Sequence, residues 1–170
     1  PQLQGHVKPR ALVVSIIAGT RIATLQALCG AQAIVRVMPN TPAQIGEGIS
    51  VWTATPAVTE TQREQVRAIL RALGREVAVD HEDYVDMATA LSGSGPAYVF
   101  LFIEGLIDAG VHMGLPRPVA EQLVLQTVRG AAIYAQQSGM HPAVLRNMVT
   151  SPGGTTAEGL LELERGALRA

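Results

Sequence analysis

The stretch ALVVSII, residues 11–17, decides the fold class of this chain. It is an almost uninterrupted aliphatic run, which is typical of a strand buried on both faces of a parallel sheet. Helical patterns follow at residues 21–30 and from Thr59, a good helix cap, to about Leu73. Further strand-like runs lie between and after them, at AIVRVMP (33–39), ISVWTA (49–54) and EVAVD (76–80). Strands that alternate with helices predict an α/β fold with a largely parallel sheet.

No strand candidate remains after Asp80, and the pattern becomes helical. Segment 96–114 is apolar almost all round, so its helix must be buried on most sides. In so small a domain, we expect a second subunit to supply that burial. Other helices are expected at residues 81–93, 116–139 and 141–149, and from about Thr156 onward. The sequence therefore predicts an α/β domain over residues 1–80 and an all-α domain over residues 81–170.

The composition argues against several classes of protein. The 170 residues are 48% hydrophobic but only 4% aromatic, which indicates a folded chain with an aliphatic core. A net charge of -1 without a basic run argues against nucleic-acid binding. No stretch of about 18 uncharged apolar residues is present, so we expect no membrane span. The single Cys29 fits a reducing, cytoplasmic location, and the scattered histidines lack metal-ligand spacing, so no metal is expected.

One segment, VTSPGGTTAEGL (149–160), has the pattern of a binding turn. Pro152, Gly153 and Gly154 interrupt the helical pattern, and Thr155 and Thr156 favour the start of a new helix. Free backbone N–H groups at such a start bind small anions, and the glycines let an anion approach the backbone. Neighbouring hydroxyls add hydrogen bonds. The alternative is an ordinary helix–helix turn with a threonine cap.

A phosphate-binding glycine fingerprint is missing from this sequence. An α/β domain that binds a dinucleotide carries G-x-G-x-x-G after its first strand. GSGPA (93–97) is not that motif, because it joins two helices. Either the domain binds no dinucleotide, or the fingerprint lies upstream of Pro1, since we expect the chain to begin inside a longer protein.

Three segments together resemble the pyrroline-5-carboxylate reductase family in order and spacing: MPNTPAQIGEG (38–48), ALSGSGPAYVF (90–100) and VTSPGGTTAEGL. VVSIIAG (13–19) is similar to a fourth landmark of that family, so the resemblance covers essentially the whole chain. It implies an oxidoreductase that reduces 1-pyrroline-5-carboxylate to L-proline with NADPH or NADH, the last step of proline biosynthesis. It also implies the C-terminal part of a Rossmann dinucleotide-binding domain, followed by a helical dimerisation and substrate domain. The active site is then expected between these domains, in a homodimer or higher homo-oligomer.

The resemblance also implies residues for the imino-acid substrate. The turn binds the substrate carboxylate, and Thr156 is the catalytic candidate because it hydrogen-bonds the ring nitrogen. Threonine is too weak an acid to be the sole proton source, so we expect water or the protonated iminium to take part. Glu82 matches a position linked to product binding; the alternative is a solvated carboxylate at a helix start. The expected substrate-binding set is Ser151, Gly153, Gly154, Thr155, Thr156 and Glu82.

Cofactor contacts are expected where buried strands end, because open α/β sheets bind ligands at the carboxyl ends of their strands. Ile17 stands where the family commonly has a smaller residue. Met148 matches a position where some members carry a cofactor-contacting asparagine, and it can offer only backbone or packing contacts. Residues 92–96 are expected to back the nicotinamide pocket, or else only to pack helices. An Asx turn before Pro42 is the alternative for the second strand end. The expected set is Ile16, Ile17, Ala18, Asn40, Thr41, Met148 and Ser94.

The sequence also departs from the family. It lacks the first half of the Rossmann domain and the last helical segment, so we expect the 170 residues alone to be inactive. Three other functions stay open: a reductase of another cyclic imine, a β-hydroxyacid enzyme, and a non-catalytic dimerisation module. A β-hydroxyacid enzyme would need a catalytic lysine in its helical domain. Lys8 is the only lysine in the sequence, which counts against that function.

Overall fold

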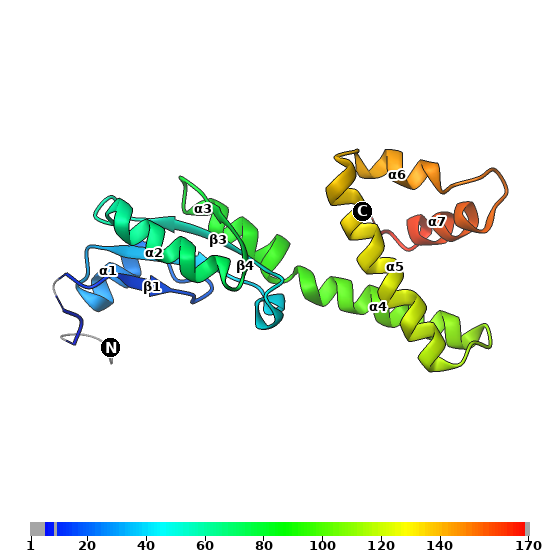
Figure 1. The fold of residues 1–170 in the computed structure, drawn as a ribbon, viewed down its shortest axis with the longest axis horizontal. Coiled ribbons are helices and arrows are strands. Elements are labelled where there is room, and N and C mark those ends of the chain that lie inside the picture. Colours follow the sequence, from blue (N-terminus) through cyan, green and yellow to red (C-terminus); the bar gives the residue numbers. More distant parts are fainter. Residues whose placement is uncertain (1–5, 9, 169–170) are drawn as a thin grey trace. The chain divides into compact units, whose positions relative to one another are not determined.

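The computed structural model describes residues 6–8 and 10–168, and it divides into two compact units (Figure 1). The first unit is Pro1–Phe102 and the second is Ile103–Ala170. The first helix that follows the sheet packs against the sheet, which is why the first unit extends beyond Asp80. The expected domain boundary near residue 80, based on the change of pattern alone, stays a prediction.

The first unit contains one sheet of four strands in the order β1-β2-β3-β4. Strands β1 and β2 are parallel, as are β3 and β4, but β2 and β3 are antiparallel. The connection between β2 and β3 contains only the short 3₁₀ helix η1 (Thr41–Ile45), whereas a parallel crossover needs a dozen or more residues. The sheet is therefore mixed rather than largely parallel. The strands are β1 (Val13–Ser15), β2 (Ile34–Met38), β3 (Gly48–Ala54) and β4 (Gly74–Ala78).

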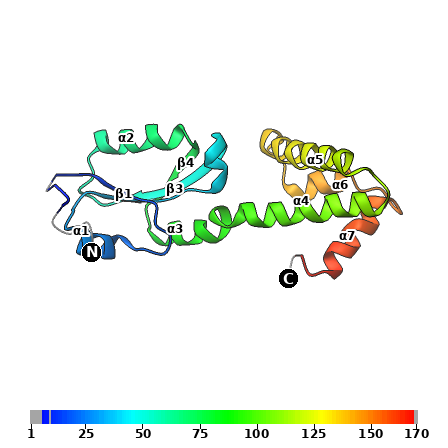
Figure 2. The ribbon, with the colours of Figure 1, turned by 90° about the horizontal axis from the view of Figure 1, so that it is seen from below.

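Helices cover both faces of this sheet. Helix α2 (Glu60–Arg71) lies on one face, while α1 (Ile22–Cys29) and α3 (Asp83–Ala88) lie on the other (Figure 2). Val35 and Val37 of β2 are buried in a cluster with Trp52, Val58, Val66 and Leu70. Ile34 is buried in a second cluster with Leu25, Cys29 and Ala31. Strand β2 is thus covered on both faces, as its apolar sequence predicts.

The start of α2 follows its sequence signal. Thr59 is the N-cap and accepts a hydrogen bond from the backbone N–H of Gln62, whose side chain in turn bonds the Thr59 N–H. This reciprocal arrangement satisfies two N–H groups that would otherwise lack partners. The expected cap at Thr59 is confirmed.

A buried charge links three elements of the first unit. The Arg36 side chain in β2 is 1% exposed, and its Nη1 donates to Glu82 Oε1 at 2.9 Å. Its Nη2 donates to Asp86 Oδ1 in α3 at 2.5 Å. Glu82 Oε1 also accepts the backbone N–H of Ile22, the first residue of α1, at 2.7 Å. Arg21 adds an outer pair with Asp86 at 3.0 Å. One guanidinium thereby joins β2, α1 and α3.

Helix α3 continues into a π-helical turn, η2 (Thr89–Gly93), and then into α4 (Gly95–His112). The π turn is marked by the Ser94 N–H, which donates to the Thr89 carbonyl at 2.8 Å. The Met38 methyl group lies against the backbone of Gly93. A Cβ added at Gly93 would be only 2.7 Å from Met38 Cε, so a side chain there would displace the methionine methyl group. The end of β2 and the α3–α4 junction are therefore in contact.

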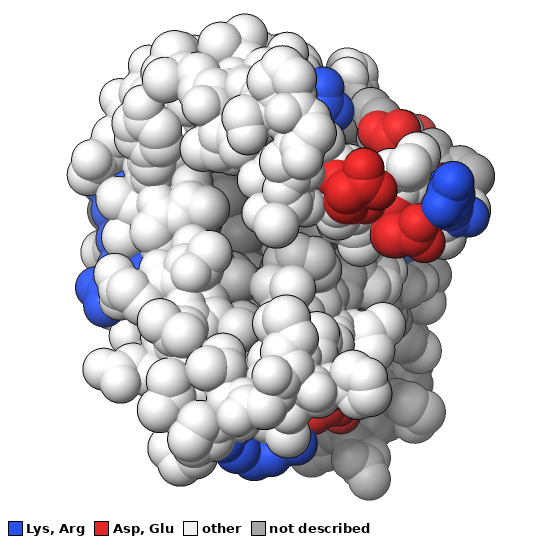
Figure 3. All heavy atoms as spheres, turned by 90° about the vertical axis from the view of Figure 1, so that its right-hand side faces the viewer, with Lys and Arg blue, Asp and Glu red and all other residues white. Residues whose placement is uncertain are grey.

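The second unit is helical. The end of α4 packs on α5 (Arg117–Ser138) at Gly110, where an added Cβ would lie 3.0 Å from the Cβ of Ala120. Asp108 and Arg117 pair across the same junction at 2.9 Å. Helices α6 (Pro142–Met148) and α7 (Thr155–Arg165) complete the unit. The side of this unit shown in Figure 3 is mostly free of charged side chains, and its charges lie toward the margins.

Much apolar surface remains uncovered in the single chain. Leu101 is 70% exposed and Phe100 is 60% exposed, although both belong to α4. The continuous helical segment Asp83–His112 is long and apolar enough, by length and composition, to cross a membrane. Core helices of soluble proteins meet the same criterion, so the segment by itself does not distinguish a membrane from a protein partner. These α4 side chains are exposed in the single chain, and their burial by a second subunit stays a prediction.

We predict that the Asp86–Arg36 pair makes stability depend on acidic pH. The hydrogen bond from Arg36 and the charges of Arg36 and Arg21 hold the pKa of Asp86 below its usual range. Its contribution is therefore complete above the unfolded pKa, about 3.9, and is lost as pH falls toward the lowered folded pKa. Asp86→Asn should lower Tm at pH 7 and reduce the fall of Tm between about pH 5 and pH 3.

Thermal unfolding followed by circular dichroism over this pH range tests the prediction. The matched control is Asp80→Asn, because Asp80 is exposed and has no ion pair among the described residues. The control should follow the wild-type profile. An Asp86→Asn profile parallel to wild type would contradict the proposed linkage.

Candidate active site

The first candidate group lies at one edge of the sheet in the first unit. In the parallel pair β1–β2, Ser15 is opposite Arg36, so the chain leaves both strands at the same edge. Ile16 and Ile17 follow β1 and are 64% and 58% exposed. The turn after β1 is held by Ser15 Oγ, which accepts the Ile17 N–H at 3.4 Å. The edge therefore presents Ile16, Ile17, Ala18, Asn40 and Thr41 together, as the strand pattern predicts.

A pocket of about 320 Å³ opens beside this edge. It brings Asn40, at the end of β2, together with Ser92 and Pro96 from the α3–α4 junction. The sequence suggested both segments separately, and the structure places them in one cavity. Ser94 lies in the same junction but does not line the cavity. The complete lining is Asn40, Pro42, Ser92, Gly95, Pro96, Val99 and Phe100.

The Asn40 side chain has a fixed orientation in this pocket. Its Oδ1 accepts the backbone N–H of Ile49 in β3 at 2.9 Å. It makes no side-chain cap for η1, so the Asx turn considered from the sequence is not the arrangement found. Ser92 Oγ, the other side-chain polar group of the lining, donates to the Ala88 carbonyl at 3.0 Å. The Asn40 amide NH₂ is thus the side-chain hydrogen-bond donor left available on a largely apolar wall.

Glu82 has structural partners rather than a solvated carboxylate. Its Oε1 accepts from both Arg36 and the Ile22 N–H. These contacts neutralise a buried cation and cap α1, because the side chain of Arg21, at the N-cap position, makes no capping hydrogen bond. The solvated alternative is wrong for Glu82, and a contact of Glu82 with substrate or product stays a prediction.

The second candidate group is the turn before α7 in the second unit. Gly154 N–H donates to the Ser151 carbonyl at 3.1 Å, and Gly153 has φ +66°. Proline followed by a left-handed glycine is the pattern of a type II turn. A Cβ at Gly154 would collide with Ser151 Oγ, so the missing side chain lets this hydroxyl lie against the helix start. The expected glycine turn is confirmed.

Several donors of this turn have no partner within the described part of the chain. Helix α7 begins at Thr155, one residue earlier than expected, and its N-cap is Gly154, which has no side-chain cap bond. The backbone N–H groups of Thr155 and Thr156 are the first two of the helix, and neither they nor the two hydroxyls bond another described residue. A threonine cap is therefore not what holds this helix. The turn instead gathers free donors at the positive end of a helix, where a carboxylate binds well.

Met148 is placed by the last turn of α6, where its side chain is 62% exposed. Its thioether can pack against a neighbouring group but offers no hydrogen-bond donor. Among residues 6–8 and 10–168, no three histidine, cysteine or acidic side chains gather into a metal site. The chemistry of the described groups is that of binding and orientation.

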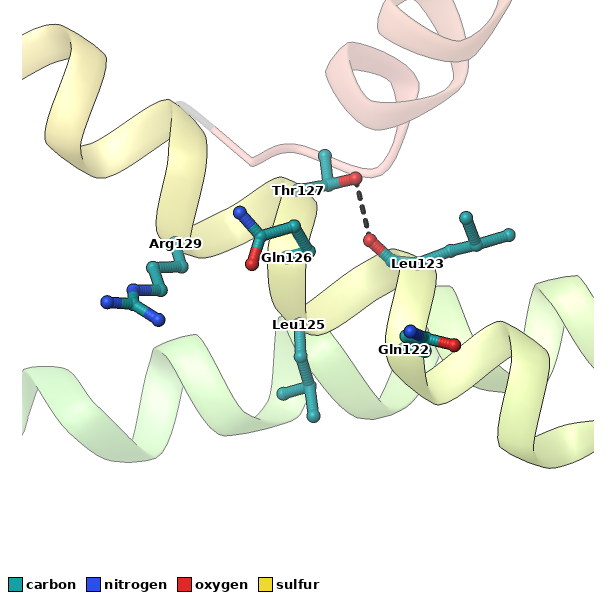
Figure 4. A pocket seen from close by; sticks show the side chains of 6 residues that line it. All are labelled: Gln122, Leu123, Leu125, Gln126, Thr127 and Arg129. Carbon is teal, nitrogen blue, oxygen red and sulfur yellow. Dashed lines mark hydrogen bonds between the residues drawn. The ribbon is translucent and has the colours of Figure 1, made fainter.

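A larger hollow on α5, of about 730 Å³, has no counterpart in the sequence-based expectations (Figure 4). All six lining residues belong to this one helix, and Thr127 Oγ1 donates to the Leu123 carbonyl at 2.7 Å. The lining holds amides, a guanidinium, leucines and one hydroxyl bonded to its own helix, with no acid or base beside that hydroxyl, which favours a contact surface over a reaction site. The lining residues are Gln122, Leu123, Leu125, Gln126, Thr127 and Arg129.

Comparison with known proteins identifies the family. The family model described as pyrroline-5-carboxylate reductase dimerisation matches residues 82–170. The chain belongs to the pyrroline-5-carboxylate reductase family. It is 46% identical over 169 residues to the pyrroline-5-carboxylate reductase of Arabidopsis thaliana, covering 99% of this chain and 61% of the relative.

Solved structures agree with this family and with its fold. The pyrroline carboxylate reductase of Plasmodium falciparum, solved with NADP bound, superposes with a TM-score of 0.88 at 42% identity. That match covers 93% of this chain and 64% of the other. A Coxiella burnetii pyrroline-5-carboxylate reductase gives 0.86 at 40% identity, over 95% of this chain and 60% of its own. The chain thus spans about 60% of the relatives it matches, and its fold resembles the C-terminal Rossmann part and the helical dimerisation domain of these enzymes.

We predict opposite effects for two glycines of the α7 region. Gly153 needs a left-handed backbone, so Gly153→Ala should destabilise the chain by about 1 kcal/mol. Gly159 lies within α7 with open space around its Cα, so Gly159→Ala should stabilise by about 0.5–1 kcal/mol. Urea unfolding of the two variants measures both changes. Equal effects of the same sign would contradict the described turn.

Proposed function

We propose that the enzyme containing this chain reduces 1-pyrroline-5-carboxylate to L-proline with NADPH or NADH in the cytoplasm. The observation that carries the proposal is the Ser151–Thr156 turn with its unpartnered donors, in a chain of the pyrroline-5-carboxylate reductase family. The substrate has one carboxylate and one C=N bond, which requires a compact anion site beside a group that orients nitrogen. The turn offers both.

The carboxylate is held by the N-terminal end of α7. The free N–H groups of Thr155 and Thr156 donate to its oxygens, and the helix dipole favours the negative charge. Ser151 Oγ adds a hydroxyl beside Gly154. Thr156 Oγ1 then hydrogen-bonds the ring nitrogen and fixes the plane of the imine. The proton on nitrogen comes from water or is already present in the iminium, because a threonine hydroxyl is too weak an acid alone.

The sheet edge fits the nicotinamide end of the cofactor. The pocket beside Asn40 has an apolar wall for a flat ring and one amide donor for a carbonyl acceptor. When bound, the reduced cofactor supplies the hydride that adds to the imine carbon. Ile16, Ile17 and Ala18 would line its approach, and Met148 and Ser94 are assigned to packing and backbone contacts with it. The relative from Plasmodium falciparum was solved with NADP bound, which supports this assignment.

The proposed assembly is a homodimer or higher homo-oligomer through α4 and α5. Exposed aromatic and aliphatic side chains on α4 would be covered by a second copy, as would the α5 hollow. The family model for dimerisation covers both helices, which supports this. A protein partner accounts for the apolar α4 without a membrane, and the near-neutral charge gives nucleic acid no electrostatic attraction. The proposed enzyme binds neither.

A non-catalytic dimerisation module is the second candidate. The exposed α4 face favours it as a description of residues 1–170 taken alone, since dimerisation needs only the helices. Titration of the enzyme and of this chain with NADPH separates the two functions. Binding by the enzyme and none by the chain would assign dimerisation to the chain and catalysis to the enzyme.

We predict that Thr156→Val lowers turnover without lowering stability. The hydroxyl makes no intrachain bond within the described residues, so the fold loses nothing in the free protein. The missing hydrogen bond to a charged iminium should cost about 1.5–3 kcal/mol, roughly ten- to a hundredfold in kcat/KM. Steady-state assays with the imine and NADPH measure this loss.

Thr150→Val is the matched control for that experiment. Thr150 Oγ1 donates to the Arg146 carbonyl at 2.7 Å, so its removal should lower Tm while turnover stays near normal. A folded Thr156→Val enzyme with the wild-type rate would remove Thr156 from the mechanism.

We predict that Leu101→Asp weakens the dimer. This side chain is 70% exposed in the single chain and lies on α4, so the proposed partner would have to bury the new carboxylate. Analytical ultracentrifugation at micromolar concentration should show more monomer than wild type. Ile69→Asp is the control, because Ile69 is 61% exposed on α2, outside residues 82–170. A wild-type assembly in both variants would exclude this face.

A further inference from the structure

We propose that Asn40 is a specificity-determining donor whose amide, oriented by β3, reads the nicotinamide carboxamide of the cofactor. The inference deepens the proposed function and rests on it. Its starting point is the bond from the Ile49 N–H to Asn40 Oδ1, at 2.9 Å. An asparagine amide has one acceptor end and one donor end. Because the backbone of β3 occupies the acceptor end, the donor end is the one presented to a ligand.

The wall around this donor is apolar. Pro42, Pro96, Val99 and Phe100 offer no hydrogen-bond donors from their side chains, and Ser92 Oγ donates to Ala88. Among the lining side chains, the Asn40 amide therefore supplies the free hydrogen-bond donor. A flat apolar ring with one carbonyl acceptor matches this lining in both shape and polarity. The carboxamide-bearing nicotinamide ring has that chemistry.

The position of Asn40 also fits a cofactor rather than a structural amide. It follows β2 at the edge where β1 also ends, and open α/β sheets bind ligands at that edge. The Asn40 amide is held rigidly, since its backbone carbonyl accepts the Ala43 N–H at 3.1 Å and its side chain is fixed to β3. A rigid donor loses little entropy on binding, so one contact can discriminate between ligands.

Asn40→Asp separates orientation from donation. Aspartate keeps an oxygen for the Ile49 N–H, so the loop stays anchored, but it replaces the NH₂ donors with an anionic oxygen. In the enzyme containing this chain, NADPH should bind about tenfold more weakly, the loss expected for one hydrogen bond. NADP⁺ should lose less, because its ring is positively charged and the new carboxylate attracts it. The ratio of the Kd of NADPH to that of NADP⁺ should therefore rise.

Equilibrium titration by NADPH fluorescence and by calorimetry with NADP⁺ measures the two Kd values without any turnover. Asn147→Asp is the matched control, because Asn147 lies on exposed α6 outside the pocket. It should leave both Kd values unchanged. Asn40→Leu removes the anchor as well, so it should lower Tm, whereas Asn40→Asp should not.

Two results would overturn the inference: an unchanged Kd ratio in a folded Asn40→Asp enzyme, or equal weakening of both cofactor forms. A rise only in the KM of the imine would assign Asn40 to the substrate instead, and would also overturn it. These binding measurements do not depend on which imine is reduced. A wild-type enzyme that binds NADPH but does not reduce 1-pyrroline-5-carboxylate would refute the proposed function. The effect of Asn40→Asp on the two Kd values would still test the role of Asn40.

Discussion

The buried guanidinium of Arg36 is the interaction on which the first unit depends. A cation in the centre of a sheet is costly unless it is paired and hydrogen-bonded, and Glu82 and Asp86 each accept a hydrogen bond from it. Within the described residues, its Nε is buried without a partner, so the two carboxylates carry the compensation. The same Glu82 oxygen fixes the first N–H of α1. This one charge therefore ties β2 to the start of α1 and to α3.

Local sequence signals predicted the parts of the structure that depend on neighbours in the chain. The Thr59 cap and the glycine turn before α7 each follow from residues within a few positions of one another. The antiparallel β2–β3 pairing was also readable in principle, since the connection after Met38 is too short for a crossover. The repeated apolar runs suggested a parallel sheet. Buried central strands of antiparallel sheets can have the same composition, so composition alone did not distinguish the two topologies.

Contacts between residues that are distant in the sequence could not be predicted from the sequence alone. An arginine inside the run IVRVM indicates a buried partner, but nothing in the sequence selects residues 46 and 50 positions away. The same applies to Asn40, whose bond to Ile49 exists because the β2–β3 pairing brings the two together. The sequence predicted cofactor contacts at both strand ends and at the α3–α4 junction. The cavity joins the end of β2, at Asn40, to that junction, and nothing in the sequence shows that Gly93 leaves room for Met38 where the two segments meet.

The π turn at Thr89–Gly93 sets the rotational phase of the long helix that follows. An α-helix advances about 100° per residue, so one extra residue in a turn rotates every later side chain by that amount. Because of this single turn, the side chains of α4 are rotated relative to the face of α3 that covers the sheet. Deleting one residue there would keep the helix, yet would turn every side chain of α4 by about 100° relative to α3.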